Sequence, residues 1–364
     1  MNKITTGAFA TLLASTAMAT AGGLDRSGQS VGILFEEGSY AEISYGYVDP
    51  SVSGTDPADT ATGDMAPAYS LLAGGYKTDI NDKISAAVIF DQPFGSNADY
   101  PLSSMVYSYT TAELTSSAVS LVASYDVNEN IVVYGGGSYQ TMEATASLPF
   151  AAGNPAFDAG GYTVDADAGS GFGYILGAAY QIPDIALRVA LTYRSEITSD
   201  HDTAEIGVTE PTGDFITTVT TPQSLNLEFQ TGVNTKTLVF GSIRWVDWSE
   251  FHLSPPDYTA AWPGPLVDYD NDTITYSLGV GRKLTDNLSG AVTVGFEDTL
   301  GSDPSPLAPT DGYLSVGAGL TYAFDNVEIT GGVKYLWLGD ADGPAGTFAD
   351  NNAMAFGLKV AFTL

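Results

Sequence analysis

Basic residues are scarce in this chain, which makes their positions informative. The sequence has 12 Lys and Arg residues against 43 Asp and Glu, and its formal net charge is −31. In several segments, large apolar residues alternate with small or polar ones. Five basic residues occupy the positions of the small or polar residues in such segments: Arg188, Arg194, Arg244, Lys334 and Lys359. In a mostly apolar pocket, such groups bind a carboxylate through charge-assisted hydrogen bonds. They are therefore candidates for holding an anionic head group.

The same basic residues have a structural interpretation. They can pair with acidic residues on the same face of neighbouring segments and brace the fold, as charged groups inside barrels do. The candidate acidic partners are Glu228, Glu297 and Glu328. The sequence leaves both roles open for each basic residue.

Apolar residues near the N-terminus are candidates for contact with a hydrophobic ligand. Leu34 and Phe35 end a short apolar run that precedes the first alternating segment. Ile89 and Leu336 lie on the phase that alternation turns inward. Large apolar side chains are unexpected in the lumen of a water-filled pore, whose lining is polar. Packing of the N-terminal run against a wall explains these residues equally well.

An interruption of strand pairing is expected next to Pro93. Proline has no amide hydrogen and cannot donate to a ladder, so it interrupts a strand or marks its end. The interruption involves Asp91, Pro93 and Phe94. It predicts either a lateral opening in a wall or the simple end of a strand.

The residues needed for catalysis are missing. A nucleophilic enzyme needs a base beside its nucleophile, but the two histidines, His201 and His252, fall in stretches predicted to be long loops, and no G-x-S-x-G elbow occurs. The stretch 268–272 resembles the start of a calcium loop. However, Thr273 stands where the sharp turn needs glycine, and Gly279 where the bidentate glutamate belongs. We therefore expect no enzymatic activity, no cofactor and no dedicated metal site.

Alternation with period two is clearest in residues 185–194. Ile185, Leu187, Val189, Leu191 and Tyr193 would form one apolar face of a β-strand, with Arg188 and Arg194 on the other. In a soluble sandwich the apolar face would be a core. In an outer-membrane barrel it would face lipid, and the arginines would face the lumen.

The N-terminus and the composition favour the membrane barrel. Residues 1–21 have a basic start, an apolar run and small residues at 19 and 21, which predicts a secretory signal peptide. No later stretch approaches 18 consecutive apolar residues, so a helical membrane protein is excluded. The acidic charge excludes a nucleic-acid-binding protein. With Cys 0, the fold has no disulfides to stabilise it.

Strand signals recur along the mature chain. Residues 22–38 have no clear period and predict a short N-terminal hatch or plug, followed by a barrel over 39–364. The fourteen or so predicted strands are 40–48, 66–79, 83–92, 116–126, 130–143, 170–182, 185–197, 223–233, 236–247, 272–284, 288–299, 312–324, 327–339 and 352–364. Short turns with Asn, Asp or Pro alternate with long acidic loops, as periplasmic turns and external loops do in outer-membrane barrels. Four aromatic residues near the loop ends of strands predict an outer girdle: Trp245, Trp248, Tyr335 and Trp337.

Several motifs, in order, resemble those of the FadL/TodX-type outer-membrane transporters of long-chain fatty acids and other hydrophobic compounds. The motifs are Pro93-Phe94-Gly95, the Gly-rich run 171–177, Tyr193-Arg194-Ser195, the W-S-x-F at 248–251 and the strand that begins at Asp272. The resemblance implies a fourteen-stranded barrel in the bacterial outer membrane. It also implies an N-terminal hatch, a hydrophobic pocket, and release of cargo by passive diffusion through a kinked third strand.

This sequence departs from the family at the hatch, where the expected Asn-Pro-Ala is replaced by Gly28-Gln29-Ser30. The expected partners are a fatty acid or another hydrophobic molecule, the barrel assembly machinery, and lipid with lipopolysaccharide, bridged by Ca²⁺ or Mg²⁺ at the acidic loops. The alternative is a diffusion porin, or an adhesive barrel, without a hydrophobic ligand. Conductance across a bilayer discriminates between an open porin and a plugged transporter.

Overall fold

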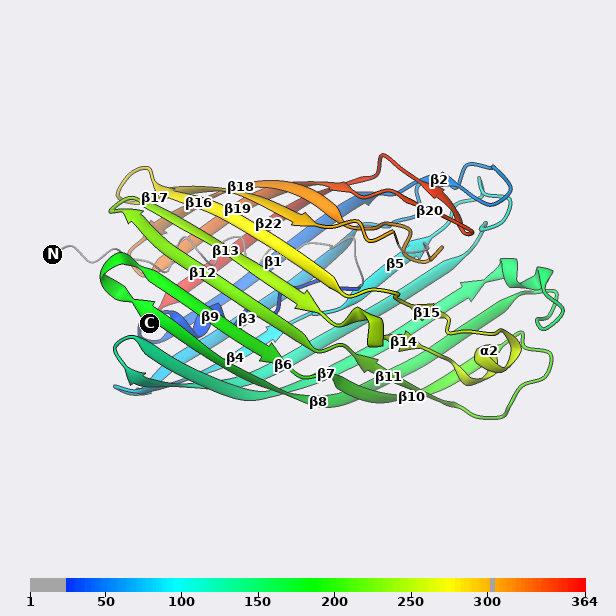
Figure 1. The fold of residues 1–364 in the computed structure, drawn as a ribbon, viewed down its shortest axis with the longest axis horizontal. Coiled ribbons are helices and arrows are strands. Elements are labelled where there is room, and N and C mark those ends of the chain that lie inside the picture. The colour runs from blue at the N-terminus through cyan, green and yellow to red at the C-terminus, as the bar shows by residue number, and fades with distance from the viewer. Residues whose placement is uncertain (1–23, 302–304) are drawn as a thin grey trace.

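The strands close into a single barrel, as the alternation predicts. The computed structural model describes residues 24–301 and 305–364. Within these ranges the sheet is antiparallel, and it closes because β1 (Tyr40–Ser51) pairs with β3 (Tyr69–Asn81) on one edge and with β22 (Asn352–Thr363) on the other (Figure 1). The predicted signal peptide, residues 1–21, lies outside the described residues. Among the described residues, no helix is long and apolar enough to cross a bilayer.

Fourteen strand positions make up the wall in the described part of the chain. In addition to β1, β3 and β22, the wall strands are β4 (Ile84–Asp91), β6 (Thr111–Asn128), β7 (Ile131–Leu148), β8 (Tyr162–Ile182), β9 (Leu187–Arg194), β12 (Ser224–Asn234), β13 (Thr237–Val246), β16 (Thr273–Lys283), β17 (Leu288–Glu297), β18 (Tyr313–Phe324) and β19 (Val327–Leu338). Short turns and the C-terminus lie at one end of the barrel, called here the turn end. The long connections lie at the other, the loop end (Figure 1).

Alternation places the apolar face of each strand outside. In β18, Leu314 and Leu320 are 49% and 54% exposed, whereas Ser315 and Thr321 point inward and are buried. In β9, Val189 is exposed and Arg194 is buried, as predicted for the segment 185–194. A continuous exposed apolar band around a closed sheet is the surface that lipid requires.

The strand predicted at 185–197 begins two residues later than expected and ends at Arg194. Ile185 belongs to the short 3-10 turn η3 (Pro183–Ile185), and Ala186 has a left-handed backbone with φ 54°. Pro183 fits the first turn of a 3-10 or α-helix because its φ is already set and it needs no amide donor there. The first ladder pair of the strand is therefore Leu187 with Ile182.

Several predicted loops contain additional strands. Beside the wall strands lie β5 (Gly95–Asp99), β10 (Ile197–Ile206) and β11 (Ile216–Thr221). Shorter elements at the loop end are β2 (Gly54–Thr55), β14 (His252–Leu253), β15 (Val267–Asp268), β20 (Ala341–Gly343), β21 (Gly346–Phe348), η2 (Pro149–Gly153), η4 (Trp248–Glu250) and α2 (Pro256–Ala261). Prediction of a loop at 198–222 was wrong because β10 and β11 pair with each other beyond the apolar band. Most residues of these two strands are polar, so their alternation carries little hydrophobic signal.

Two individual placements were also wrong. His201 lies in β10 rather than in a loop, and it is 2% exposed. Trp248 is not in an aromatic girdle: it is fully buried and packs edge-on against Phe94 and Phe251 at ring-centroid distances of 5.7 Å. The chain leaves the sheet after β13, and η4 then turns Trp248 into the lumen.

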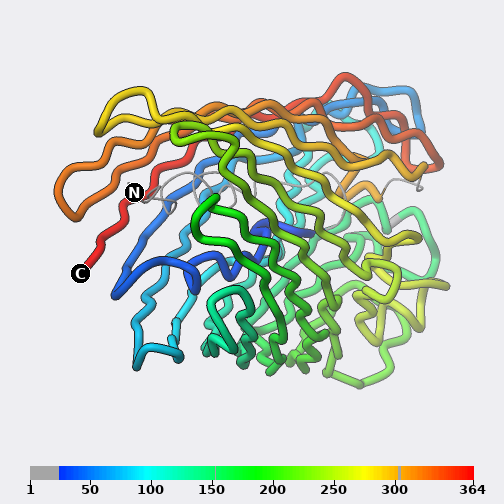
Figure 2. The backbone as a smooth tube through the Cα atoms, turned by 60° about the vertical axis from the view of Figure 1, so that its left-hand side comes forward, coloured from blue at the N-terminus to red at the C-terminus, as the bar shows by residue number. Residues whose placement is uncertain are grey.

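Residues 24–38, called here the N-terminal segment, run inside the barrel before β1 begins. The dark blue trace crosses the space between the strands in Figure 2. Its 3-10 turn η1 (Gly32–Phe35) brings Ile33 and Leu34 into a buried cluster with Ala87 and Val122 of the wall. This cluster anchors the segment near the turn end of the barrel.

Candidate functional site

The barrel wall has an interrupted ladder beside β3. β3 pairs with β4 from Asn81 to Gly74, which lies opposite Phe90. The wall strand then breaks after Asp91 and continues as β5 from Gly95, which pairs with β6. Among the described residues, the first part of β3 therefore has no ladder partner on this side. We call this gap between β3 and β5 the portal.

Side chains satisfy backbone groups that the break leaves free. The amide of Leu72 donates to Gln92 Oε1 at 2.7 Å. Ser116 Oγ accepts from the amide of Phe94 and donates to its carbonyl, both at 2.8 Å. Because unpaired backbone groups are costly when buried, these contacts allow the wall to remain interrupted.

The N-terminal segment lies against the portal. The amide of Arg26 donates to the carbonyl of Pro93 at 2.7 Å, and the amide of Gly95 donates to the carbonyl of Leu24 at 2.8 Å. These bonds flank an antiparallel bridge between Asp25 and Phe94. The segment thus pairs with the wall where the strand is broken.

A side-chain contact adds to this pairing. Ser27 Oγ donates to Asp91 Oδ2 at 2.9 Å, and Asp91 is 8% exposed. The three residues predicted to mark an opening, Asp91, Pro93 and Phe94, therefore each contact the N-terminal segment.

An apolar cavity lies on the loop-end side of this contact. The space free of protein atoms between its walls is about 720 Å³, part of it open to solvent. Its walls include Leu24, Leu114, Met142, Val219, Phe251 and Leu253. None of the described residues that line it is Lys or Arg.

The histidine of this cavity has polar partners, whereas the buried hydroxyl of Tyr269 has none among the described residues. His201 Nδ1 is 2.9 Å from the carbonyl oxygen of Asp167, and its Nε2 is 2.8 Å from Ser199 Oγ. Glu113, an acidic lining residue, is exposed on the phase of β6 opposite to the buried Leu114. The cavity therefore offers an apolar surface without a charged side chain pointing into it.

A second apolar hollow lies at the loop end. It holds about 1,200 Å³ between residues 148–157, the end of α2 and residues 305–307, and Trp262 on its rim is 43% exposed. Leu266 and Leu307 line both this hollow, called here the groove, and the apolar cavity. An apolar surface therefore continues from the loops toward the portal.

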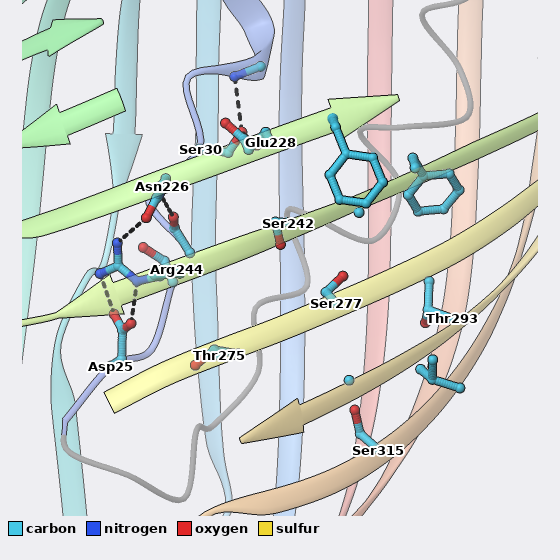
Figure 3. A pocket seen from close by; sticks show the side chains of 18 of the residues that line it. Asp25, Ser30, Asn226, Glu228, Ser242, Arg244, Thr275, Ser277, Thr293 and Ser315 are labelled. Atoms are coloured by element: carbon cyan, nitrogen blue, oxygen red, sulfur yellow. Dashed lines mark hydrogen bonds and ion pairs between the residues drawn. The ribbon is translucent and has the colours of Figure 1, made fainter. Parts of the chain in front are cut away.

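The opposite side of the N-terminal segment faces a polar cavity of about 1,160 Å³ (Figure 3). Hydroxyl groups of Ser242, Ser277 and Ser315 line its wall. Arg244 forms a two-point ion pair with Asp25 of the segment, at 2.6 and 3.1 Å. A buried pair of this kind fixes the segment because loss of one partner leaves the other charge buried.

Comparison with known proteins identifies the family. Residues 33–353 match the family model described as outer membrane protein transport protein (OMPP1/FadL/TodX). The chain belongs to this family. Members are outer-membrane transport proteins and not enzymes. No curated protein sequence matches the chain at a significant level.

Solved structures of FadL/TodX-type barrels share the fold. A Pseudomonas aeruginosa FadL homologue is 15% identical, with a TM-score of 0.74 over 97% of this chain and 98% of that chain. The Pseudomonas putida toluene transporter TodX is 13% identical, with a TM-score of 0.66 over 90% of each chain. The Ralstonia pickettii toluene transporter TbuX is 14% identical, with a TM-score of 0.63 over 99% of each chain.

In this FadL/TodX-type barrel, the predicted basic residues all face the lumen but none lines the apolar cavity. Arg194 donates to the carbonyl of Gln29 at 2.9 Å, and the Arg188 guanidinium lies 4.4 Å from the centre of the Phe35 ring. Lys359 pairs with Glu42 at 3.1 Å. Arg188, Arg244 and Lys334 line the polar cavity. The ion-pair partner of Arg244 is Asp25 of the N-terminal segment, not a barrel glutamate.

The predicted apolar residues lie away from the apolar cavity. Leu34 is 4% exposed, and Phe35 packs edge-on against Tyr134 at 5.8 Å, in the cluster near the turn end. Ile89 packs on the same cluster, and Leu336 belongs to another cluster toward the loop end. The sequence reasoning missed Met142 and Phe251, although Met142 lies on the inward phase of β7.

Docking of the N-terminal segment should depend on pH through Glu36. Burial raises the pKa of Glu36 from 4.5 to about 7, although Lys359 and Arg188 nearby act in the opposite direction. The docked segment therefore binds a proton between pH 4.5 and 7, and docking should weaken as the pH rises through this window. We expect protection factors for hydrogen exchange at residues 33–36 to fall between pH 5 and 8.

A matched pair of variants checks this dependence. Glu36→Gln should keep the protection factors constant over the same pH range, because the amide cannot ionise. Glu37→Gln changes an exposed neighbour and should retain the wild-type pH dependence. An equal pH dependence in wild type and Glu36→Gln would exclude Glu36 as its origin.

No metal centre is evident in the part of the chain that the structure describes. In residues 24–301 and 305–364, no group of three His, Asp or Glu side chains could hold a metal ion.

Proposed function

We propose that this chain carries uncharged hydrophobic molecules across the outer membrane by passive diffusion. A molecule would enter the groove, pass into the apolar cavity and leave sideways through the portal. The observation that carries this proposal is the apolar cavity, which lies between the groove and the N-terminal segment and has no basic lining residue among those described. Long-chain fatty acids would be carried in their protonated form only.

The distribution of positive charge supports uncharged cargo. Fatty-acid carboxylates would need a basic partner, since burying an unpaired ion in an apolar site is costly. The inward-facing arginines are held by other groups: Arg244 by Asp25, and Arg194 by Gln29. Structural neighbours described as toluene transporters and as a monoaromatic hydrocarbon channel are in keeping with such cargo.

The N-terminal segment would act as the plug. It contacts the edges of the portal on one side and Arg244 of β13 on the other. Passage would therefore require only local movement at residues 26 and 27, while the ion pair of Asp25 and the apolar cluster around Leu34 hold the rest in place. No energy source is needed, because hydrophobic molecules move down their own concentration gradient.

Binding of matched neutral and anionic molecules tests this proposal. We expect the purified protein to bind ethylbenzene at least about tenfold more tightly than phenylacetate, and dodecane more tightly than laurate at pH 8, because an unpaired buried charge costs more than 1.4 kcal/mol. Displacement of a neutral fluorescent naphthylamine measures all four affinities. Equal or tighter binding of the carboxylates would exclude neutral cargo.

A charge placed in the cavity gives the complementary test. Met142→Lys should weaken ethylbenzene binding at least about tenfold and improve phenylacetate binding, because the new ammonium group would pair with the carboxylate. Met105→Lys is the control, since Met105 is 78% exposed in a loop. If Met142→Lys leaves both affinities unchanged, the ligand does not occupy this cavity.

A further inference from the structure

Arg26 has an unusual position for a charged side chain in the N-terminal segment. It is 8% exposed, and its guanidinium carbon lies 3.3 Å from the centre of the Tyr69 ring. Nε donates to the carbonyl of Gly95 at 2.9 Å, and Nη2 donates to Asn97 Oδ1 at 3.0 Å. The guanidinium therefore contacts both sides of the portal, because Tyr69 belongs to β3, whereas Gly95 and Asn97 belong to β5.

This arrangement depends on the shape of a guanidinium group. Its flat face stacks on an aromatic ring while its N–H groups donate in the plane, so one side chain can contact two separated strands. A lysine ammonium has no flat face and no fixed fork of donors. Arg26 thus joins two strands that lack a ladder between them.

The wall provides space for this side chain at Gly95. A Cβ atom at that position would lie 3.2 Å from Arg26 Nε and 3.3 Å from its Cγ, closer than ordinary van der Waals contact. Gly95 also donates its amide to Leu24, so the same residue receives the side chain and the backbone of the N-terminal segment. A side chain at this position would force Arg26 to shift by a few tenths of an ångström.

Two adjacent residues of the N-terminal segment contact different parts of the wall. Asp25 contacts Arg244 on β13, whereas Arg26 contacts β3 and β5. Release of Arg26 would therefore free the portal while the ion pair of Asp25 and the cluster around Leu34 still hold the segment in the barrel.

We propose that Arg26 is the latch of the portal: its side chain bridges β3 and β5 when the portal is closed and must withdraw before a hydrophobic molecule leaves. The inference rests on the proposed lateral release. It adds that a single basic side chain, rather than the fold of the whole segment, sets how often the portal opens.

Hydrogen exchange at the portal tests the latch. In Arg26→Ala, we expect the amide of Gly95 to exchange about tenfold faster or more, because hydrogen bonds from a charged donor and the ring contact are lost. Arg26→Lys should behave nearly like Arg26→Ala, since it keeps the charge but loses the planar fork. Arg282→Ala removes an exposed arginine and is the matched control.

The partners of Arg26 keep the test decisive if Arg26→Ala folds poorly. Asn97→Ala and Tyr69→Leu should each accelerate exchange at Gly95. When either is combined with Arg26→Ala, the double variant should exchange more slowly than the sum of the two effects predicts, because residues in one contact network are not independent. Unchanged exchange at Gly95 in folded Arg26→Ala would overturn the latch.

Transport separates failure of the latch from failure of the proposed function. Uptake of a neutral hydrophobic probe by cells should rise severalfold in Arg26→Ala, because opening of a gate often limits such a rate. Normal uptake by the wild type with no change in Arg26→Ala would contradict the latch and leave lateral release intact. Failure of the wild type to bind or carry neutral probes would contradict the proposed function itself.

Discussion

Oxidation of a Ser27→Cys/Asp91→Cys double variant will stop uptake of a neutral hydrophobic probe, and reduction will restore it. The two side chains are in contact at 2.9 Å, and the chain has Cys 0, so the engineered pair is the only possible disulfide. Such a bond would hold the N-terminal segment against the portal. We expect uptake by oxidised cells to fall at least about tenfold, since opening a covalently closed gate requires breaking the bond.

The controls for this lock separate closure of the portal from general rigidity. Each single cysteine variant should transport normally under both redox conditions. Ser39→Cys/Thr78→Cys joins two hydroxyl-bearing residues that are 2.9 Å apart near the turn end, and it should transport normally when oxidised. A short bifunctional thiol reagent can replace oxidation where the disulfide forms slowly. Uptake that continues through a fully oxidised Ser27→Cys/Asp91→Cys protein would contradict lateral release.

Removal of residues 24–35 will convert a poorly conducting barrel into a steadily conducting channel. The wall beside the N-terminal segment carries hydroxyl groups from Ser242, Ser277 and Ser315, and a space lined in this way fills with water. In the intact protein the segment fills the lumen next to this wall. Recordings from planar bilayers should show few steady openings for the wild type and large, stable ones for the deletion.

A second variant tests whether packing or chain length closes the barrel. Replacement of Val31, Ile33, Leu34 and Phe35 by Ser keeps the length but removes the apolar cluster. It should also conduct, because the segment would lose the burial that anchors it. Large steady conductance in the wild type would instead favour a diffusion porin, and a silent deletion variant would exclude the segment as the plug.

Much of the barrel could be predicted because the alternation of apolar and polar residues that defines each strand lies within that strand's own sequence. In β18, alternation of Leu314 and Leu320 with Ser315 and Thr321 fixes both the strand and its two faces. Alternation did not predict the strands that lie beyond the lipid-facing band. There, residues such as Thr198 and Thr220 pair across β10 and β11 through their hydroxyl groups, and the sequence has no apolar period to indicate a strand.

The candidate site could be predicted only in part, because its contacts join distant residues. Pro93 indicated an interrupted strand from its own chemistry, without reference to the rest of the chain. The partner of Arg244 is Asp25, 219 positions away, and alternation alone suggested closer acids on the wall. Arg26 is the only basic residue in the sequence between 22 and 38. That isolation was a usable signal, but its partners Tyr69 and Asn97 become apparent only when the barrel closes.

Photolabelling with a neutral diazirine-bearing hydrocarbon tests the central claim most directly. If uncharged hydrophobic molecules pass through the apolar cavity, irradiation of intact outer membranes should label Leu114, Met142 and Leu253, and excess unlabelled hydrocarbon should prevent this labelling. Label that is confined to lipid-facing residues such as Leu121 and Leu320, and that is insensitive to competition, would contradict the claim.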